Sequence, residues 1–111
     1  MKIEQSQQGT IAVLVPHGAI IDDDREKFSE AISKSIEGGR AKIIIDMSNV
    51  PFVESQGLEM LLDSAESASF HGGGIRIMNP SDIVRDILTA TRLTSKIELH
   101  NDMLEARRSL L

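Results

Sequence analysis

Histidine, serine and acidic side chains are the groups of this chain best suited to catalysis or metal binding, since cysteine is absent. The three histidines, His17, His71 and His100, stand far apart in the sequence, and none has a partner at the i, i+3 or i, i+4 spacing of a helix. A metal site needs three or four donors that converge at fixed spacing. We therefore expect surface or capping histidines and no bound metal.

Three consecutive aspartates, Asp22, Asp23 and Asp24, form the densest acidic run. They could hold a divalent cation, but the first turn of a helix also favours each negative charge, by about 0.3–1 kcal/mol. We favour the helix start. The run Gly72-Gly73-Gly74 resembles a phosphate loop only in part, because it lacks the Lys-Ser/Thr ending and follows a predicted helix. The sequence predicts a plain turn there and no cofactor site.

Serine hydroxyls are the remaining possible nucleophiles. Ser48, Ser55 and Ser64 lie in no G-x-S-x-G motif, and no histidine lies near them in sequence, so an enzyme or small-ligand binder is the weakest hypothesis. Ser55 is the most informative of the three, because it follows a strand and a loop and begins a predicted helix. Its hydroxyl could cap that helix, which is worth about 1 kcal/mol. It could also accept a phosphate, which free N–H groups at a helix start would bind.

Apolar runs that alternate with helical patterns predict the elements that position these residues. Strands are expected at residues 2–8, 10–16, 42–46, 75–78 and 97–100, and helices beginning near residues 22, 55, 81 and 102. Ile83, Ile87 and Leu88 are expected to face the core. Helices between strands indicate crossover units and a mainly parallel sheet. The predicted fold is therefore a single α/β domain over residues 1–111, with one antiparallel edge strand and about four helices.

Composition and charge restrict the partners. The chain has 111 residues, 41% hydrophobic, with three aromatic residues, all Phe, and a net charge of −5. This acidity argues against binding to nucleic acid or to an anionic membrane, and few aromatics are available to stack on bases. No apolar run approaches the ~20 residues of a membrane span, and the polar N-terminal residues do not form a signal peptide. We expect a cytoplasmic protein that acts by being bound by another protein.

The stretch from Asp46 to Leu58 resembles the central motif of the STAS domain family, which includes the bacterial anti-sigma-factor antagonists. The family pattern Asp-x-Ser/Thr-x-Val-x-Phe-x-Asp-Ser-Ser/Thr-Gly-Leu stands here as DMSNVPFVESQGL. Similar residues continue outside the motif, at Gly18, Gly73 to Ile77, Val84, Leu88, Thr91, Leu93 and Ile97. The resemblance thus extends over nearly the whole chain and implies the fold predicted above.

The resemblance implies a regulatory switch in transcription. Members of the family bind an ATP-dependent protein kinase that is also an anti-sigma factor, and they thereby release the sigma factor. The kinase phosphorylates the serine that follows the acid of the motif, the phosphoprotein no longer binds, and a phosphatase resets the cycle. By position, the phosphoacceptor is Ser55.

Three positions depart from the pattern: Glu54 replaces the aspartate, Gln56 replaces the second hydroxyl residue, and Ile21 stands at the usual acidic position of the first loop. Some family members are never switched and serve as fixed subunits of sensory complexes or with transport ATPases. An unswitched adaptor is therefore the alternative.

The expected partner-binding face lies at the carboxyl ends of the parallel strands, where open α/β sheets present their sites. Gly57 is included because glycine in the first turn of a helix suggests close approach of a partner or of a neighbouring loop. We expect Gly57→Ala to leave the fold intact or slightly stabilised and to impair binding. Met60 is expected to be exposed. The residues assigned to this face are Asp22, Asp23, Glu54, Gln56, Gly57, Glu59 and Met60.

Overall fold

The computed structural model describes all residues from 1 to 111 and begins with an antiparallel pair of strands. β1 (Lys2–Gln8) pairs with β2 (Ile11–His17) across a tight turn, in the register Gln8↔Ile11 to Lys2↔His17. β1 is largely exposed, whereas most of β2 is buried. The polar edge strand predicted from the sequence is therefore confirmed, and its polarity follows from its place at the border of the sheet.

The remaining strands continue the sheet in chain order and in parallel. β3 (Lys42–Asp46), β4 (Gly74–Met78) and β5 (Glu98–His100) follow β2, giving the order β1-β2-β3-β4-β5. The connections are α1 (Asp22–Glu37), α2 (Ser55–Phe70) and α3 (Asp82–Ala90) with the short 3-10 helix η1 (Leu93–Ser95), and α4 (Met103–Ser109) ends the chain. The predicted α/β fold with one antiparallel pair and four helices is confirmed.

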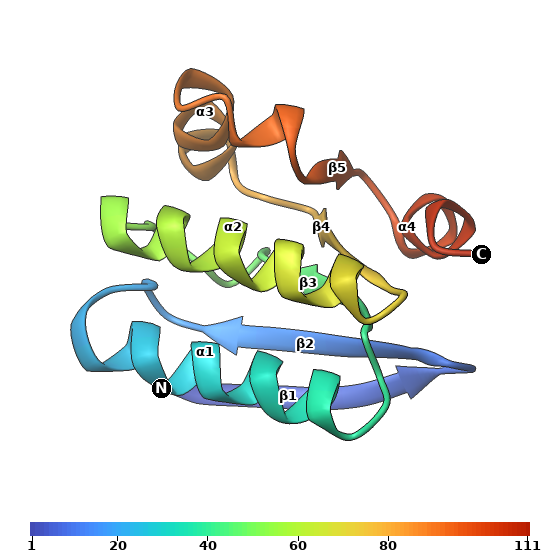
Figure 1. Ribbon diagram of the computed structural model, residues 1–111. Helices are drawn as coiled ribbons and strands as arrows, with labels where there is room; N and C mark the ends of the chain where they lie inside the picture. The colour runs from blue at the N-terminus through green and yellow to red at the C-terminus, as the bar shows by residue number, and fades with distance from the viewer.

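Alternating side chains of the strands feed two cores, one on each face of the sheet. Figure 1 shows α1 and α2 in front of the strands and α4 apart from these helices. The larger core joins Ile43 and Ile45 of β3 to buried residues of α1, α2 and α3. Ile44 points to the opposite face, where it meets Ala106 and Leu110 of α4. Crossovers of one hand that step in one direction along a sheet place their helices on the same face, so α1, α2 and α3 form one layer.

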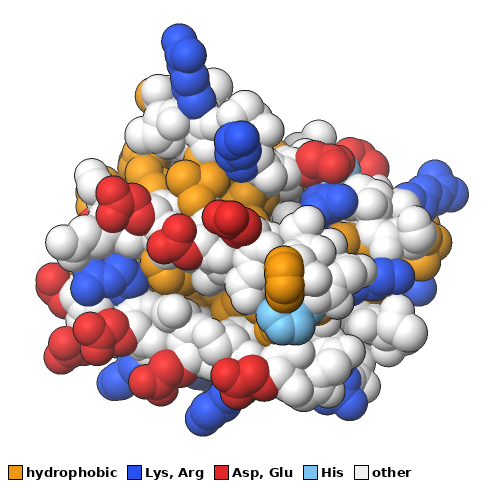
Figure 2. Space-filling model, viewed as in Figure 1, with side chains coloured by type: hydrophobic (Ala, Val, Ile, Leu, Met, Phe, Trp, Pro, Cys, Tyr) orange, Lys and Arg blue, Asp and Glu red, His pale blue; other side chains and the backbone are white.

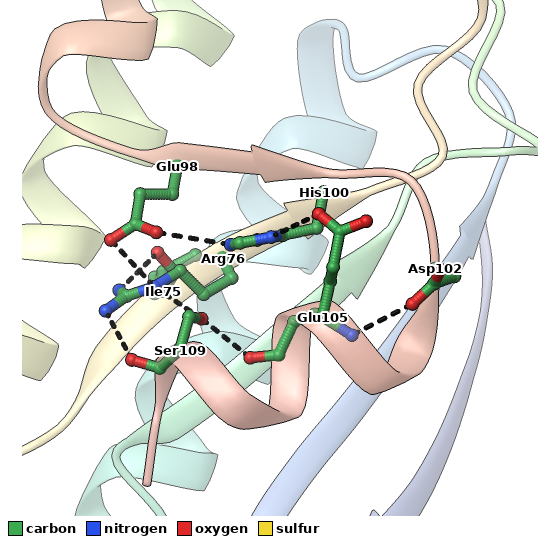
Figure 3. A network of polar contacts seen from close by, with 8 residues as sticks. Ile75, Arg76, Glu98, His100, Asp102, Glu105 and Ser109 are labelled. Carbon is green, nitrogen blue, oxygen red and sulfur yellow. Dashed lines mark hydrogen bonds and ion pairs between the residues drawn. The ribbon is translucent and has the colours of Figure 1, made fainter.

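α4 is held on the second face by polar contacts as well as by apolar ones (Figure 3). Arg76 of β4 donates from Nε to Ser109 Oγ over 3.0 Å and from Nη2 to the Ser109 carbonyl over 3.2 Å. His100 lies between two carboxylates, 3.3 Å from Glu98 and 3.3 Å from Glu105. Asp102 caps α4 by accepting from the Glu105 N–H at 2.9 Å.

One apolar side chain that was predicted to face the core is instead exposed. Ile83 is 65% exposed. α3 buries Val84 and Leu88, which are one helical turn apart, so Ile83 falls off the buried stripe. The sequence also did not predict η1, which follows a left-handed residue, Arg92, at φ 61°. No helix of the structure is long and apolar enough to span a membrane.

Candidate functional site

Two loops at the carboxyl ends of β2 and β3 pair with each other through their backbones. The Gly18 N–H donates to the Asn49 carbonyl at 3.0 Å, and the Ile20 N–H donates to the Phe52 carbonyl at 2.9 Å. Ile20 and Val53 form a parallel bridge, and Ile20 also accepts from the Glu54 N–H at 3.3 Å. The parallel pairing of β2 and β3 thus resumes beyond the strands and fixes the start of α2 against the start of α1.

Ser55 is the first residue of α2 and is exposed. The N-cap position belongs to Glu54, and no side chain caps this helix. The Ser55 hydroxyl has no hydrogen-bond partner within the chain, in contrast to Ser81, which caps α3 by accepting from the Val84 N–H at 3.2 Å. The prediction that Ser55 caps α2 is therefore wrong, because the helix begins one residue earlier than the cap assignment requires. Its hydroxyl is left free at a helix N-terminus.

Arg25 of α1 contacts both neighbours of Ser55. Its Nη1 donates to the Glu54 carboxylate, which also accepts from the Asp22 N–H at 3.0 Å. The same Nη1 donates to Gln56 Oε1 at 2.7 Å. The side chains of Arg25 and Glu54 are 22% and 23% exposed. We refer to these contacts of Arg25 with Glu54 and Gln56 as the Arg25 clamp; it ties the first turns of α1 and α2 together on either side of Ser55.

The other acidic residues assigned to this face are exposed. Asp22 and Asp23 lie in the first turn of α1, as predicted, and Asp22 adopts a left-handed conformation with φ 48°. Asp and Asn adopt this conformation more readily than other residues with a Cβ. Glu59 is exposed one turn into α2 and forms no ion pair or hydrogen bond within the chain. The structure thus brings Asp22, Glu54 and Gln56 together around the Arg25 clamp.

Gly57 and Met60 differ from what was expected. Gly57 is buried, and a Cβ at this position would lie 2.9 Å from Val53 Cγ1 and 3.0 Å from the Ile20 carbonyl oxygen. The neighbouring loop therefore makes the close approach, and these contacts favour a loss of stability for Gly57→Ala in place of the preserved or slightly raised stability expected from the sequence. Its effect on partner binding stays a prediction. Met60 is half-buried against the main core, with Ser64 Oγ 3.6 Å from its sulfur, so it is not the fully exposed residue expected.

Sequence reasoning missed two residues of this face. Arg25 is the only base among the acids at the start of α1, which is the one signal that could have singled it out. Phe52 lies two residues before the N-cap of α2 and is 47% exposed, so a large apolar side chain stands uncovered in the loop that leads to Ser55. It is available to a partner.

The other candidate sites considered from the sequence are a metal site and a phosphate loop. No three His, Asp or Glu side chains are arranged to hold a metal ion. The predicted turn after α2 lies at His71 and Gly72, and Gly74 already begins β4. Gly73 packs so closely on Ala41 that a Cβ would clash with its carbonyl oxygen. Close backbone packing accounts for this glycine without any ligand.

Comparison with solved structures finds the same fold in proteins of low sequence identity, and no curated protein sequence matches the chain. A Thermotoga maritima protein with a provisional description as an anti-sigma factor antagonist is 19% identical, with a TM-score of 0.90 over 97% of this chain and 93% of that one. SpoIIAA of Bacillus in its phosphorylated form is 18% identical, with a TM-score of 0.73 over 97% and 99%. The murine anion transporter Slc26a9 is 18% identical, with a TM-score of 0.77 over 90% of this chain but only 17% of the transporter.

Structural similarity at these low sequence identities shows a shared fold and no more. Membership of a family rests on the comparison with family models. The family model for the STAS domain matches residues 2–106, which include all five strands, the motif from Asp46 to Leu58 and the paired loops around Ser55. The chain therefore belongs to the STAS domain family.

Proposed function

We propose that this protein is an anti-sigma-factor antagonist whose binding to a partner kinase, itself the anti-sigma factor, is switched by phosphorylation of Ser55. The observation that carries the proposal is the free hydroxyl of Ser55, which is exposed at the first residue of α2 and has no hydrogen-bond partner. A kinase can reach such a hydroxyl without unfolding any element. A phosphatase that removes the phosphate would reset the switch, and the site would lie in a cytoplasmic protein.

The surroundings of Ser55 favour a phosphate that leaves the fold intact. A phosphate carries about −1.5 to −2 charge at neutral pH and is stabilised at a helix N-terminus by free N–H groups and the macrodipole. The Glu54 carboxylate is nearest in sequence, but Arg25 and the Asp22 N–H already bind it. The Arg25 clamp thereby reduces the repulsion that Glu54 would exert on the phosphate.

The partner would be a protein that covers the paired loops and the start of α2. Phe52 offers an apolar contact to such a partner. Polar contacts at the border of this surface are offered by Asp22, Asp23, Gln56 and Glu59. Interfaces commonly place a buried aromatic anchor within a polar rim. A phosphate on Ser55 would have to be buried at the centre of this surface, which explains why binding would fail.

Phosphate transfer tests the proposal directly. The chain and its Ser55→Ala and Ser48→Ala variants are incubated with ATP and with the kinase that co-purifies with the wild type, and the intact masses are measured. Ser48 is a matched control. It is exposed in the loop between β3 and α2, and its hydroxyl also has no hydrogen-bond partner. We expect one phosphate on the wild type and on Ser48→Ala, and none on Ser55→Ala. Transfer to Ser55→Ala would assign the switch to another residue.

The second candidate is an unswitched STAS adaptor in a larger assembly. The observation in its favour is the Gln56 side chain, which Arg25 holds at 2.7 Å where the family pattern has a hydroxyl residue. An ordered amide beside Ser55 narrows the access of a kinase. If no kinase transfers phosphate to the wild type, and Ser55→Ala and Ser55→Asp bind the partner equally well, the adaptor replaces the switch.

A further inference from the structure

A groove on the helical layer, separate from the Ser55 face, runs along the C-terminal half of α2. It has a volume of about 640 Å³ and is lined by Leu62, Ala65, Glu66, Ser69, Phe70 and Lys96. Figure 2 shows hydrophobic side chains gathered in the hollow between α2 and the part of the molecule that contains α3. Glu66 lies eleven residues beyond Ser55 in the same helix, which places it about 16 Å away along the helix axis.

The most exposed aromatic side chain of the molecule stands at one end of this groove. Phe70 is 88% exposed, and its ring meets that of His71 edge to face with centroids 5.5 Å apart. Leu62 and Ala65 line the groove and also pack against the main core. A wall of half-buried apolar side chains that ends in an uncovered phenyl ring is an apolar surface without an internal partner.

Glu66 lines the groove together with Lys96, and further carboxylates without ion-pair partners precede Glu66 along α2. Glu59, Asp63 and Glu66 recur at helical spacing on the outward side of α2, in line with Phe70, and all three are exposed. α2 contains no Lys or Arg, and none of the three carboxylates forms an ion pair within the chain. Like charges one turn apart destabilise a helix, so the row is unfavourable for the isolated domain and would be relieved by a basic partner.

We propose that this groove binds an amphipathic helical segment of another protein, with apolar residues against Leu62, Ala65 and Phe70 and with Lys or Arg residues against Asp63 and Glu66. The charge of the rim selects this occupant. Anionic lipid would be repelled by the carboxylates, and an open groove along a helix accepts a second helix in a recurring mode of peptide recognition. The site rests on the proposed function only in that both make the chain a protein-binding module.

The test uses the full chain and a synthetic amphipathic helix of about 20 residues, long enough to be helical, with Leu on one face and Lys on the other. A second peptide carries Glu in place of Lys. Binding is followed by fluorescence anisotropy of the labelled peptides and by amide chemical shifts of the chain. We expect the Leu/Lys peptide alone to bind and to shift the amides of residues 62–70 and 96.

Variants separate the groove from general attraction of a basic peptide to an acidic protein. Asp63→Lys with Glu66→Lys should raise the Kd by about tenfold or more, whereas Glu26→Lys with Glu30→Lys, the same charge change at exposed unpaired positions of α1, should change it by less than about twofold. Phe70→Ser, with unchanged melting temperature, should raise it by about fivefold. Equal losses of affinity for the Leu/Lys peptide in the two double variants would overturn the proposal. So would equal affinities of the Leu/Lys and Leu/Glu peptides for the wild type.

Other occupants give distinct results. Concentration-dependent self-association of the chain that Phe70→Ser abolishes would assign the groove to a second copy and overturn the proposal. Binding of anionic vesicles that Phe70→Ser abolishes would overturn it in favour of lipid. Ser55→Asp should leave the peptide Kd unchanged, because the groove is remote from Ser55. Failure of the groove thus leaves the Ser55 switch intact, and failure of phosphate transfer leaves the groove intact.

Discussion

Ser55 is the first residue of α2 and does not cap the helix. Its neighbour Glu54 occupies the N-cap position without a capping bond, so the hydroxyl of Ser55 is bonded to nothing within the chain. A serine retained for capping would accept from a backbone N–H, as Ser81 does. The free hydroxyl is what the proposed modification requires.

Replacement of each serine by alanine measures this difference. Ser81→Ala should lower the free energy of unfolding by about 1 kcal/mol, because it removes the cap of α3. Ser55→Ala should change it by less than about 0.5 kcal/mol, as for a surface substitution without contacts. Urea denaturation of the two variants provides the comparison. A loss of about 1 kcal/mol or more for Ser55→Ala would show that the hydroxyl is bonded in solution and is not free for transfer.

Arg25 stabilises the same region through charge. Because Arg25 and Glu54 are mostly buried and hydrogen-bonded, Arg25→Ala should lower the free energy of unfolding by about 1–2 kcal/mol, near the lower end of the range for hydrogen bonds to charged groups. Lys27→Ala, at an exposed position of the same helix without an ion pair, is the matched control and should be nearly neutral. A double-mutant cycle with Glu54→Gln isolates the pair. Additive losses in that cycle would mean that the Arg25 clamp contributes no coupling between α1 and α2.

At the scale of elements, the junction of the first loop with α2 depends on the absence of a side chain at Gly57. Gly57→Ala adds a methyl group 2.9 Å from Val53 Cγ1 and 3.0 Å from the Ile20 carbonyl, and the backbone oxygen cannot move without breaking its bond with the Glu54 N–H. Overpacking of this kind costs about 1–3 kcal/mol, which exceeds the gain in helix propensity of up to about 1 kcal/mol.

We therefore expect Gly57→Ala to lower the melting temperature, whereas Ser67→Ala, at an exposed position of the same helix, should leave it unchanged or raise it slightly. Thermal unfolding followed by circular dichroism measures both. A Gly57→Ala variant as stable as the wild type would show that the loop can retreat from α2. The paired loops would then not be the rigid junction described above.

Most of the elements could be predicted from the sequence, because short apolar runs and helical stripes alternate without interruption. Runs such as Ile43-Ile44-Ile45 can be buried only between two layers, and each predicted strand is present. What could not be predicted depends on contacts between distant segments. The Arg25 clamp joins residues about thirty positions apart, and no periodicity encodes such a pair.

The errors at α2 and α3 have a common origin in helix phase. An N-cap is defined by one residue, and the cap of α2 falls on Glu54 instead of Ser55. A shift of one residue turns a side chain by about 100° around the helix, which is how Ile83 comes to be exposed while Val84 is buried. The structure brings Asp22, Glu54 and Gln56 together where the sequence placed them, at the carboxyl ends of the strands, and their contact with a partner stays a prediction. The hydrogen bonding of Ser55 and the burial of Gly57 needed the structure.

At the scale of the whole molecule, the sheet order places Ser55 and the paired loops on elements that pack on one continuous core. The helices α1, α2 and α3 pack on one face of a sheet whose larger core is continuous beneath them, and the paired loops lie at the end of this layer (Figure 1). A phosphate would add about −1.5 to −2 charge to a chain of net charge −5 without entering either core. We therefore predict that phosphorylation of Ser55 changes the surface charge of the chain and leaves its fold unchanged.

The affinity of the partner kinase for the chain before and after phosphorylation of Ser55 tests the central claim most directly. Isothermal titration of the unmodified chain, the Ser55-phosphorylated chain and the Ser48→Ala variant should give equal Kd values for the first and third. Phosphorylation should raise the Kd by about a hundredfold, which corresponds to ~3 kcal/mol for burying a poorly paired charged group. The melting temperature and circular dichroism spectrum of the phosphorylated chain should match those of the unmodified chain. Equal affinities, or loss of binding through unfolding, would contradict the account.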